Sequence, residues 1–357
     1  MSAEGIKRRE FIGGMAALSM VPAAGLAGAD EVAKGGGAGL EAANLYGDAR
    51  RDVAKKGEMP YRMLGKTGAQ VSCIGLGGYH LGTSRMTDAE MMNLFHAAVD
   101  RGINFSDNCW DYNDGASEER MGKALADGYR NKAFLMTKLD GRTGASAKQQ
   151  LEQSLTRLKT DHIDLVQIHE VIRMGDPEQA FQPGNIVEVL QQARKEGKIR
   201  YIGFTGHKSP NIHLHMIETA DKHGFTFDTV QMPVNALDEH YESFCQKVIP
   251  QAQKRGMAVL GMKPLSNGAI LKTGTITAPQ ALHYAMSVPV TVTITGCQSM
   301  ANLEQALSVA RNFQPMTREQ KLAVLEKTAP VATKGQFEAY KSSQIYDGTT
   351  NNPQWLG

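Results

Sequence analysis

Leu165-Val166-Gln167-Ile168 is a short apolar run, typical of a buried strand, and it ends directly before His169. Two earlier runs end in the same way. Gly102-Ile103-Asn104-Phe105-Ser106 precedes Asp107, and Ala133-Phe134-Leu135-Met136-Thr137 precedes Lys138. Parallel strands deliver the loops at their carboxyl ends to one common face, where α/β proteins place their sites. Three successive strands that each end in a polar residue therefore predict a functional site at that face.

Tyr112 lies five residues past Asp107, in the loop that leaves the same strand. A phenol, an amine, a carboxylate and an imidazole that meet at one mouth form a proton-transfer set. The ammonium group of Lys138 is expected to lower the pKa of Tyr112 from about 10, while Asp107 holds the lysine and His169 orients a carbonyl. Taken singly, such residues are more often surface ion pairs. The occurrence of all four residues at the ends of successive strands favours a catalytic role.

From Tyr61 onward, strand-like runs alternate with amphipathic helical stretches, which is the pattern of β/α units around a parallel sheet. The expected strands are 71–76, 103–106, 133–137, 165–168, 201–205, 229–231, 258–262 and 290–295. The expected helices are 88–101, 117–127, 146–158, 185–196, 210–223, 239–255, 279–287 and 300–311. Eight units of each kind predict the α/β class and a closed (β/α)₈ TIM barrel. A doubly wound open sheet is the alternative, but Gly75-Leu76-Gly77-Gly78 matches its glycine-rich turn only in part.

The N-terminus carries an export pattern. Lys7-Arg8-Arg9-Glu10-Phe11-Ile12 precedes a run of small and apolar residues that extends to Ala29. This is typical of a twin-arginine signal peptide over residues 1–29, which predicts the twin-arginine export machinery as a partner and a periplasmic location. The run is too weakly hydrophobic to predict a stable membrane anchor. A cytosolic protein with a chance arginine pair is the alternative.

The rest of the chain divides into three further segments. Residues 30–59 form a glycine-rich segment that is expected to be a flexible linker. Residues 60–312 contain the barrel, which at about 250 residues has the usual size for this fold. Residues 313–357 form a C-terminal extension with helical stretches near 317–327 and 331–340. The sequence leaves open whether this extension walls the substrate pocket or packs under the barrel.

Composition favours a small-molecule protein. The 39 basic and 37 acidic residues give a net charge of +2, which leaves no excess for nucleic acid, and no basic stripe with interleaved aromatic residues occurs. The four cysteines lie far apart and form no C-x-x-C pair, so no metal site is expected. These are Cys73, Cys109, Cys245 and Cys297.

The motifs of the chain resemble those of the aldo-keto reductase family from about Tyr61 to Arg311. The matching strings, in order, are Tyr61-Arg62-Met63-Leu64-Gly65-Lys66-Thr67-Gly68, Val71-Ser72-Cys73-Ile74-Gly75-Leu76-Gly77-Gly78, Gly102 to Asp107 with Tyr112, Thr137-Lys138, and Asp161 to His169. The resemblance implies a hairpin that caps the barrel. It also implies that Tyr112 is the general acid/base, that Lys138 and Asp107 tune it, and that His169 positions the carbonyl oxygen.

The resemblance further implies a bound nicotinamide dinucleotide cofactor, which lies across the carboxyl ends of the barrel strands. By resemblance to the family this cofactor is NADP(H). Gln231 matches the residue that binds the carboxamide, but Gly206 and Met262 replace an asparagine and a stacking tyrosine, and Lys263 replaces a serine near the pyrophosphate. The full expected cofactor set is Gly78, Thr205, Gln231, Met262, Lys263, Leu265, Gly296 and Gln298.

The last phosphate loop, 294–300, departs from relatives that use NADPH. Those relatives carry lysine or arginine there for the 2′-phosphate, whereas no cation occurs between Thr291 and Ala310. Each missing charge-assisted bond costs roughly 1.5–3 kcal/mol. The hypothesis is that the preference for NADP(H) is weakened and that NAD(H) binds comparably.

The expected activity is reduction of an aldehyde or ketone to an alcohol, or the reverse. Aromatic residues in loops at the mouth suggest a sugar-like or polyol substrate, and the expected substrate wall consists of Tyr79, His80, Trp110 and Phe181. A non-catalytic barrel that binds the cofactor as a sensor or partner subunit is the competing class. A second enzyme alternative is a cofactor that is held tightly and recycled in place.

Overall fold

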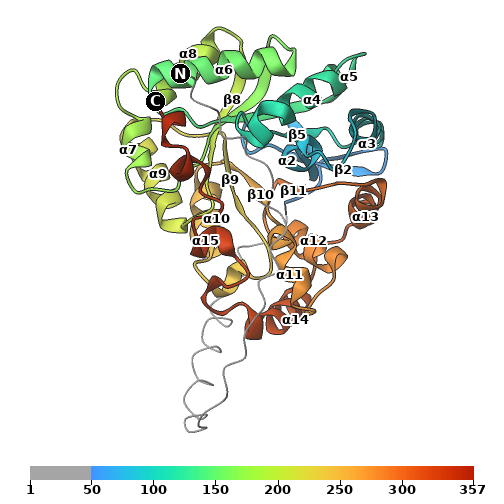
Figure 1. Cartoon of the computed structure of the whole chain (residues 1–357). Coiled ribbons are helices and arrows are strands. Elements are labelled where there is room, and N and C mark those ends of the chain that lie inside the picture. The colour runs from blue at the N-terminus through green and yellow to red at the C-terminus, as the bar shows by residue number, and fades with distance from the viewer. Residues whose placement is uncertain (1–49) are drawn as a thin grey trace, which may run out of the picture. The chain divides into compact units, whose positions relative to one another are not determined.

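The computed structural model describes residues 50–357, and its centre is a closed barrel of parallel strands (Figure 1). Each strand pairs with the next along the chain, and the last pairs with the first. This confirms the predicted (β/α)₈ TIM barrel. The barrel strands are β4 (Ile74–Gly77), β5 (Phe105–Asp107), β6 (Phe134–Leu139), β7 (Ile163–Ile168), β8 (Ile199–Thr205), β9 (Thr229–Pro233), β10 (Ala258–Met262) and β11 (Val292–Thr295).

Strand alternation points the polar strand-end residues into the barrel. Side chains two apart on a strand share a face. Phe105 and Met136 belong to the buried apolar cluster inside the barrel. Asp107 follows Phe105 by two on β5, and Lys138 follows Met136 by two on β6. Because Phe105 and Met136 point into the barrel, the side chains of Asp107 and Lys138 also point inward, nearer its carboxyl end.

Helices surround the barrel, one or more after each strand. Thr87 forms a capping box with Glu90, and Ser209 caps a helix that begins with Pro210. The helices are α2 (Gly78–Gly82), α3 (Asp88–Asp100), α4 (Ala116–Ala124), α5 (Tyr129–Lys132), α6 (Gly144–Leu158), α7 (Asp176–Ala180), α8 (Ile186–Lys195), α9 (Pro210–Lys222), α10 (Phe244–Lys254), α11 (Ala269–Lys272), α12 (Ala278–Ser287), α13 (Met300–Arg311), α14 (Arg318–Thr328), α15 (Ala339–Ser342) and α16 (Gly348–Asn351).

A small antiparallel sheet covers the amino end of the barrel. It consists of β1 (Ala54–Lys56), β2 (Met59–Met63) and β3 (Gln70–Ser72). Leu64 and Val71 from this sheet join the apolar cluster of the barrel. Lys66 N donates to Gly256 O at 3.0 Å, close to the start of β10. This sheet is the expected cap.

The cap corrects two sequence predictions. The expected strand 71–76 is two strands, because Val71 pairs with Arg62 in the cap whereas Ile74 pairs with Thr293 in the barrel. The expected linker 30–59 is also too long, because β1 pairs with β2 through Ala54 and Tyr61. The lysines of this segment are compatible with a strand because β1 is a sheet edge, where lysine is common.

Two helix predictions also need correction. The expected helix 239–255 begins only at Phe244, because Asp238–His240 forms a 3₁₀ turn and Ser243 caps the helix that follows. The expected helix 331–340 is broken into turns. Lys334 and Gly335 have φ of +59° and +65°, which a continuous right-handed helix excludes.

The C-terminal extension lies over the carboxyl mouth of the barrel. In Figure 1 the red segment runs from α14 past α15 to the C-terminus beside α7. Asn235, in the loop after β9, donates to the Tyr340 hydroxyl at 2.9 Å. Leu356 O accepts from Arg142 N at 2.9 Å, in the loop after β6. The extension therefore covers the site face and does not pack under the barrel.

The predicted signal peptide and most of the predicted linker lie outside the described residues, so the export prediction stays a prediction. None of the helices in the described part of the chain combines the length and apolarity that a membrane crossing requires.

Candidate active site

Lys138 is the centre of the residue set that the sequence predicts. Its Nζ forms an ion pair with the Asp107 carboxylate, donates to Asn108 O at 2.6 Å and donates to the Tyr112 hydroxyl at 3.2 Å. The three protons of the ammonium group are therefore engaged. Both Lys138 and Asp107 are buried. The structure thus brings the phenol, amine and carboxylate together at the carboxyl ends of neighbouring strands.

A left-handed turn sets the position of Tyr112. Tyr112 begins a 3₁₀ turn in which Asn113, Asp114 and Gly115 have φ of 53°, 57° and 91°. Asparagine, aspartate and glycine are the residues that tolerate this region best. Asn113 Nδ2 ties the turn to Tyr79 O at 2.9 Å. Because the chain reverses direction in this turn, the Tyr112 hydroxyl lies next to Lys138 Nζ.

The expected lowering of the tyrosine pKa is wrong for this arrangement. Burial and the Asp107 charge together raise the pKa of Tyr112 well above its ordinary value. Because the Lys138 charge is balanced by Asp107, it does not offset the loss of water around the phenol. Tyr112 therefore remains protonated at neutral pH, which suits a proton donor.

His169 follows β7 and lies edge-on to Tyr112, with 6.1 Å between the ring centroids. Its Nδ1 lies 2.8 Å from Asp140 Oδ1 and 3.3 Å from Cys109 Sγ. Burial lowers the pKa of His169, but the charge and hydrogen bond of Asp140 outweigh this and raise it. With Nδ1 held by the carboxylate, Nε2 is the ring atom available to a carbonyl oxygen.

Asp111 adds a second carboxylate beside this imidazole. Its Oδ1 lies 3.8 Å from His169 Nδ1. Burial and the charge of Asp140 raise the pKa of Asp111 to about 6.

The C-terminal extension closes the far side of the site. Glu170 accepts from Thr349 N at 2.8 Å and lies 2.9 Å from His207 Nε2, while His207 Nδ1 lies 3.0 Å from Tyr340 O. Burial would raise the pKa of Glu170, but the hydrogen bond with His207 and the His169 charge lower it to about 2. These contacts fix the extension over the ends of β7 and β8.

The expected carboxamide and nicotinamide positions gather at the same mouth. Thr205 ends β8, Gln231 lies in β9 and Met262 ends β10. Gln231 Oε1 is buried and has no hydrogen-bond partner in the described part of the chain, and its Nε2 donates to Asp107 Oδ2 at 3.5 Å. A buried acceptor with no partner carries a desolvation cost that an amide donor would relieve.

The glycines predicted on the cofactor side have a packing role. A Cβ at Gly78 would overlap Asp107 O, and a Cβ at Gly296 would overlap the His80 ring. Gly296 is followed by Gln298 and then by α13, whose amino end is capped by Ser299. The amino end of a helix favours phosphate, because its free backbone N–H groups and its dipole attract an anion.

Lys263 and Leu265 lie in the loop after β10. Lys263 has a φ of +56°, and its Nζ lies 5.4 Å and 5.6 Å from the ring centroids of Tyr340 and Tyr346. No carboxylate of residues 50–357 forms an ion pair with it. Burial lowers the pKa of Lys263 to about 8. Leu265 precedes the 3₁₀ turn Ser266–Gly268.

A family model, that of the aldo/keto reductase family, matches residues 73–281, which is more than half of the chain. The chain belongs to this family. It is 31% identical over 233 residues to aldo-keto reductase YhdN of Bacillus subtilis, a match that covers 61% of this chain and 65% of that one. It is 30% identical over 227 residues to 6-dehydroglucose reductase of Novosphingobium aromaticivorans, with 59% and 70% covered.

The fold is that of solved aldo-keto reductases. The holo form of aldo-keto reductase AKR11C1 from Bacillus halodurans superposes with a TM-score of 0.64 at 24% identity and covers 78% of this chain and 99% of that one. Together with the family match, this makes the protein an oxidoreductase enzyme on a TIM barrel.

Three of the four predicted substrate-wall residues lie near this reductase's tyrosine or its mouth. Tyr79 is 51% exposed and stands edge-on to Tyr112 with 5.5 Å between centroids. His80 packs against Gly296. Trp110 donates from Nε1 to Gln153 at 2.7 Å, and its ring meets the ring of Trp355 from the extension at 5.8 Å.

Phe181 does not lie at the mouth, and that prediction is wrong. Its ring packs on His223, Phe225 and Phe227 at centroid distances of 4.8, 5.9 and 6.1 Å. These partners directly precede β9, so they lie at the amino end of the barrel. Phe181 is part of a packing cluster between α9 and β9.

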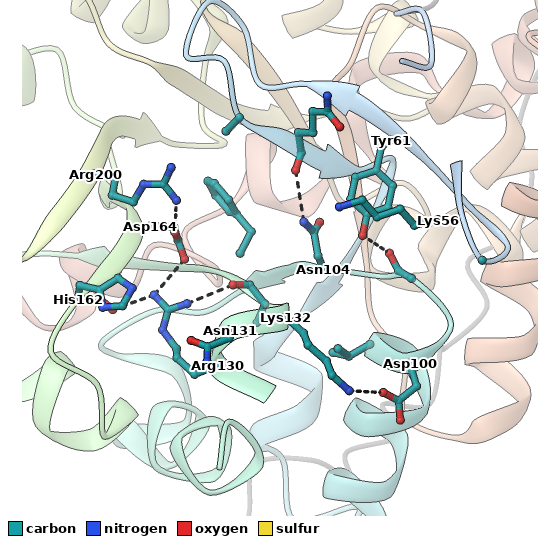
Figure 2. Close-up of a pocket in the computed structure, with 17 residues that line it drawn as sticks. Lys56, Tyr61, Asp100, Asn104, Arg130, Asn131, Lys132, His162, Asp164 and Arg200 are labelled. Atoms are coloured by element: carbon teal, nitrogen blue, oxygen red, sulfur yellow. Dashed lines mark hydrogen bonds and ion pairs between the residues drawn. The ribbon is translucent and has the colours of Figure 1, made fainter. Parts of the chain in front are cut away.

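A cavity of about 620 Å³ lies at the opposite end of the reductase barrel, beside the cap (Figure 2). Of its six lysine, arginine and aspartate residues, five pair with one another, and the sixth, Lys56, lies over the Tyr61 ring. Asp164 pairs with Arg200 at 2.8 Å and with Arg130 at 3.0 Å, and Lys132 pairs with Asp100 at 2.9 Å. These ion pairs stabilise the lining of the cavity, and the predicted catalytic residues lie at the other end of the barrel.

Several residues at the site were missed by sequence reasoning. They are Asn108, Asp111, Asp140, Arg142, Glu170 and His207. All of them lie in loops at the carboxyl ends of strands, within a few residues of a predicted position. The rule that found the first four residues would have found these too, had it been applied to every polar side chain in those loops.

Proposed function

We propose that this aldo/keto reductase family member reduces an aldehyde or ketone to an alcohol, and catalyses the reverse oxidation, with Tyr112 as the proton donor. The observation that carries the proposal is the hydrogen bond of 3.2 Å from Lys138 Nζ to the Tyr112 hydroxyl, in a set that also holds Asp107 and His169. A phenol in this position can pass a proton to an oxygen that approaches from the mouth.

Each residue has a separate task in the proposed reaction. Tyr112 donates its hydroxyl proton to the carbonyl oxygen. Lys138 holds that hydroxyl in place and stabilises the phenolate as it forms, while Asp107 keeps the ammonium group oriented. His169, fixed through Nδ1 by Asp140, directs Nε2 to the same oxygen. The nicotinamide cofactor, when bound, supplies the hydride for the carbonyl carbon.

The residues at the mouth fit a nicotinamide dinucleotide. The unpaired Oε1 of Gln231 can accept from the carboxamide, and the Lys263 ammonium group has no carboxylate partner among the described residues. Thr205, Met262 and Leu265 line the same side. The loop of Gly296 and Gln298 before α13 is suited to the phosphates.

The 2′-phosphate preference is expected to depend on Arg85. The hypothesis of weakened NADP(H) preference considered only residues 291–310, but Arg85 Nη1 donates to Gln298 Oε1 at 3.2 Å from a distant segment. Arg85→Met should weaken NADPH binding by about ten- to hundredfold and leave NADH binding unchanged, since a charge-assisted bond contributes about 1.5–3 kcal/mol. Fluorescence titration of both reduced cofactors checks this.

The matched control for Arg85 is Arg318→Met, which removes the same charge from an exposed position on α14. It should change neither affinity. Equal losses for NADPH and NADH in Arg85→Met would contradict a role at the 2′-phosphate.

Cofactor affinity is expected to depend on pH through Lys263. Its pKa lies at about 8, so the side chain is an ammonium below this pH and a neutral amine above it. Only the ammonium attracts a diphosphate. Binding should therefore weaken as the pH rises through about 8, by roughly ten- to hundredfold. Titrations between pH 6.5 and 9.5 should show this trend, and Lys263→Met should bind weakly at every pH. A pH-independent affinity in the unaltered protein would exclude the assignment.

A polyhydroxylated carbonyl compound is the proposed substrate class. The exposed ring of Tyr79 beside Tyr112 offers an apolar face against which a sugar ring can pack. A relative at 30% identity is named 6-dehydroglucose reductase, which supports this chemistry.

A panel of aldehydes, ketones and keto sugars with NADH and NADPH tests the function, followed at the nicotinamide absorbance. Oxidation of reduced cofactor that depends on the carbonyl compound is the expected result, with hydroxyl-rich members turned over faster than apolar ones of equal size. Cofactor binding without turnover across the whole panel would favour the competing non-catalytic barrel.

A further inference from the structure

Four potential metal ligands, one of them His169 itself, meet on the Nδ1 side of the His169 ring. They are Cys109 Sγ, Asp111, Asp140 and His169 Nδ1, whose ligand atoms all lie within 4.8 Å of one another. His169 Nδ1 lies 2.8 Å from Asp140 Oδ1, 3.3 Å from Cys109 Sγ and 3.8 Å from Asp111 Oδ1.

The cluster leaves two carboxylate oxygens without partners. Asp140 Oδ2 and Asp111 Oδ1 are buried and have no hydrogen-bond partner among residues 50–357, and the Asp140 side chain has an exposure of 0%. Burying an ionised oxygen with no donor or cation is costly. Asp111 Oδ1 faces the other ligands, since it lies 3.8 Å from His169 Nδ1, and an oxygen without a partner in this position indicates a missing positive partner.

Neighbouring cations do not supply that partner. Within residues 50–357, no lysine or arginine forms an ion pair with Asp111 or Asp140. Lys138 is committed to Asp107, and Arg142 donates to the backbone oxygens of Asp140 and Glu170 at 2.8 and 3.0 Å. The cluster therefore has two carboxylates and one imidazole, but no permanent positive charge of its own.

We propose that Cys109, Asp111, Asp140 and His169 form a binding site for a divalent cation of the zinc class. Thiolate, imidazole and carboxylate are the ligands that zinc takes in proteins, at about 2.0–2.3 Å, which separates tetrahedral ligand atoms by roughly 3.3–3.8 Å. Two of the three separations from His169 Nδ1 fall in this range, Asp140 would move slightly outward on binding, and the remaining ligand pairs, all within 4.8 Å, would move closer together where needed.

The topology explains why the spacing of the cysteines in the sequence does not point to this cluster. Cys109 and Asp111 follow β5, Asp140 follows β6 and His169 follows β7, so three neighbouring strand ends supply the ligands. Glu170 lies close by but is excluded, because Thr349 and His207 occupy its two oxygens.

The proposed binding step is balanced by proton release. Coordination of the cation forms four bonds and displaces the thiol proton of Cys109 and any proton on His169 Nδ1 into solvent, with no change in oxidation state. His169 Nε2 remains directed to the mouth, so the cation would fix the imidazole without occupying the position of the carbonyl oxygen. This inference does not depend on the proposed reduction.

Metal analysis of the full chain tests the site. The protein is purified without a histidine tag, stripped with a chelator and titrated with Zn²⁺ and Co²⁺. The expected result is saturation at about one equivalent per chain, with a thiolate-to-cobalt charge-transfer band in the near ultraviolet. Failure of the stripped, folded protein to bind either ion at micromolar concentration would overturn the proposal.

Variants identify the ligands. Cys109→Ser and the isosteric Asp140→Asn should weaken Zn²⁺ binding by at least about 100-fold, since even residues that only orient a ligand cost 10- to 100-fold. The cobalt band should vanish in Cys109→Ser. Cys297→Ser is the control, because Cys297 is a buried free thiol that belongs to no ligand cluster of the described residues, and it should keep both affinity and band. Unchanged binding in both test variants would also overturn the proposal.

Discussion

Tyr112→Phe is expected to lower turnover by about 10²–10⁴-fold, because the variant lacks the only hydroxyl that Lys138 holds at the mouth among the described residues. The phenylalanine ring fills the same volume, and the ion pair of Lys138 with Asp107 remains. The Kd for the reduced cofactor should therefore change by less than about threefold. Steady-state kinetics with the best substrate of the panel, together with a cofactor titration, give both quantities.

The control for this variant is Tyr129→Phe. Tyr129 begins α5, and its hydroxyl donates to Asp100 at 2.8 Å on the surface, away from the mouth. It should leave turnover unchanged. If Tyr112→Phe kept turnover within tenfold of the unaltered enzyme, another group would have to donate the proton.

Lys138→Met is expected to abolish measurable turnover and to destabilise the fold. The substitution removes the donor to Tyr112 and leaves the buried Asp107 carboxylate without its cation. Breaking a buried pair by removing one partner costs about 3–5 kcal/mol. The unpaired Asp107 charge would also raise the pKa of Tyr112 further, which makes the phenolate still harder to form. Urea unfolding measures the stability change.

A double variant separates the two effects. Asp107→Asn combined with Lys138→Met removes both charges, so most of the lost stability should return, because replacing both members of a buried pair is often nearly neutral. Turnover should not return, since Tyr112 still lacks the ammonium group. A double variant as unstable as Lys138→Met alone would show that the ion pair is not the cause. A stable and active Lys138→Met enzyme would contradict the role given to the lysine.

Alternation along strands explains why so much of the fold and the site could be predicted. A run such as Ala133 to Thr137 shows both that a strand exists and that the residue after it lies at the carboxyl end. Asp107, Lys138 and His169 were found in this way, and the barrel followed from eight repeats of the same unit. These features are determined by short stretches of sequence, so they can be predicted from local hydrophobic patterns.

Features that depend on distant segments could not be predicted. The pKa of Tyr112 depends on burial, which no local pattern reports, and the sign of its shift was wrong for that reason. Arg85 meets Gln298 across 213 residues of chain, so a search of the phosphate loop alone missed it. Phe181 was assigned to the mouth by its aromatic character, although its packing partners come from the segment before β9.

The C-terminal extension gives a further example. Its helical pattern over 331–340 predicted a helix, yet the segment forms turns that follow the surface of the mouth. Its position is set by contacts with loops more than a hundred residues away, among them Tyr340 with Asn235 and Thr349 with Glu170. Tertiary contacts of this kind override local propensity.

We propose that hydride passes to a carbonyl carbon at this site while Tyr112 protonates the oxygen. Incubation of the enzyme with a carbonyl substrate and reduced cofactor deuterated at both C4 positions, followed by mass spectrometry of the product, tests it most directly. The account predicts an alcohol with one deuterium on the former carbonyl carbon, formed by the unaltered enzyme and lost with Tyr112→Phe. An alcohol without deuterium, or equal product from both proteins, would contradict it.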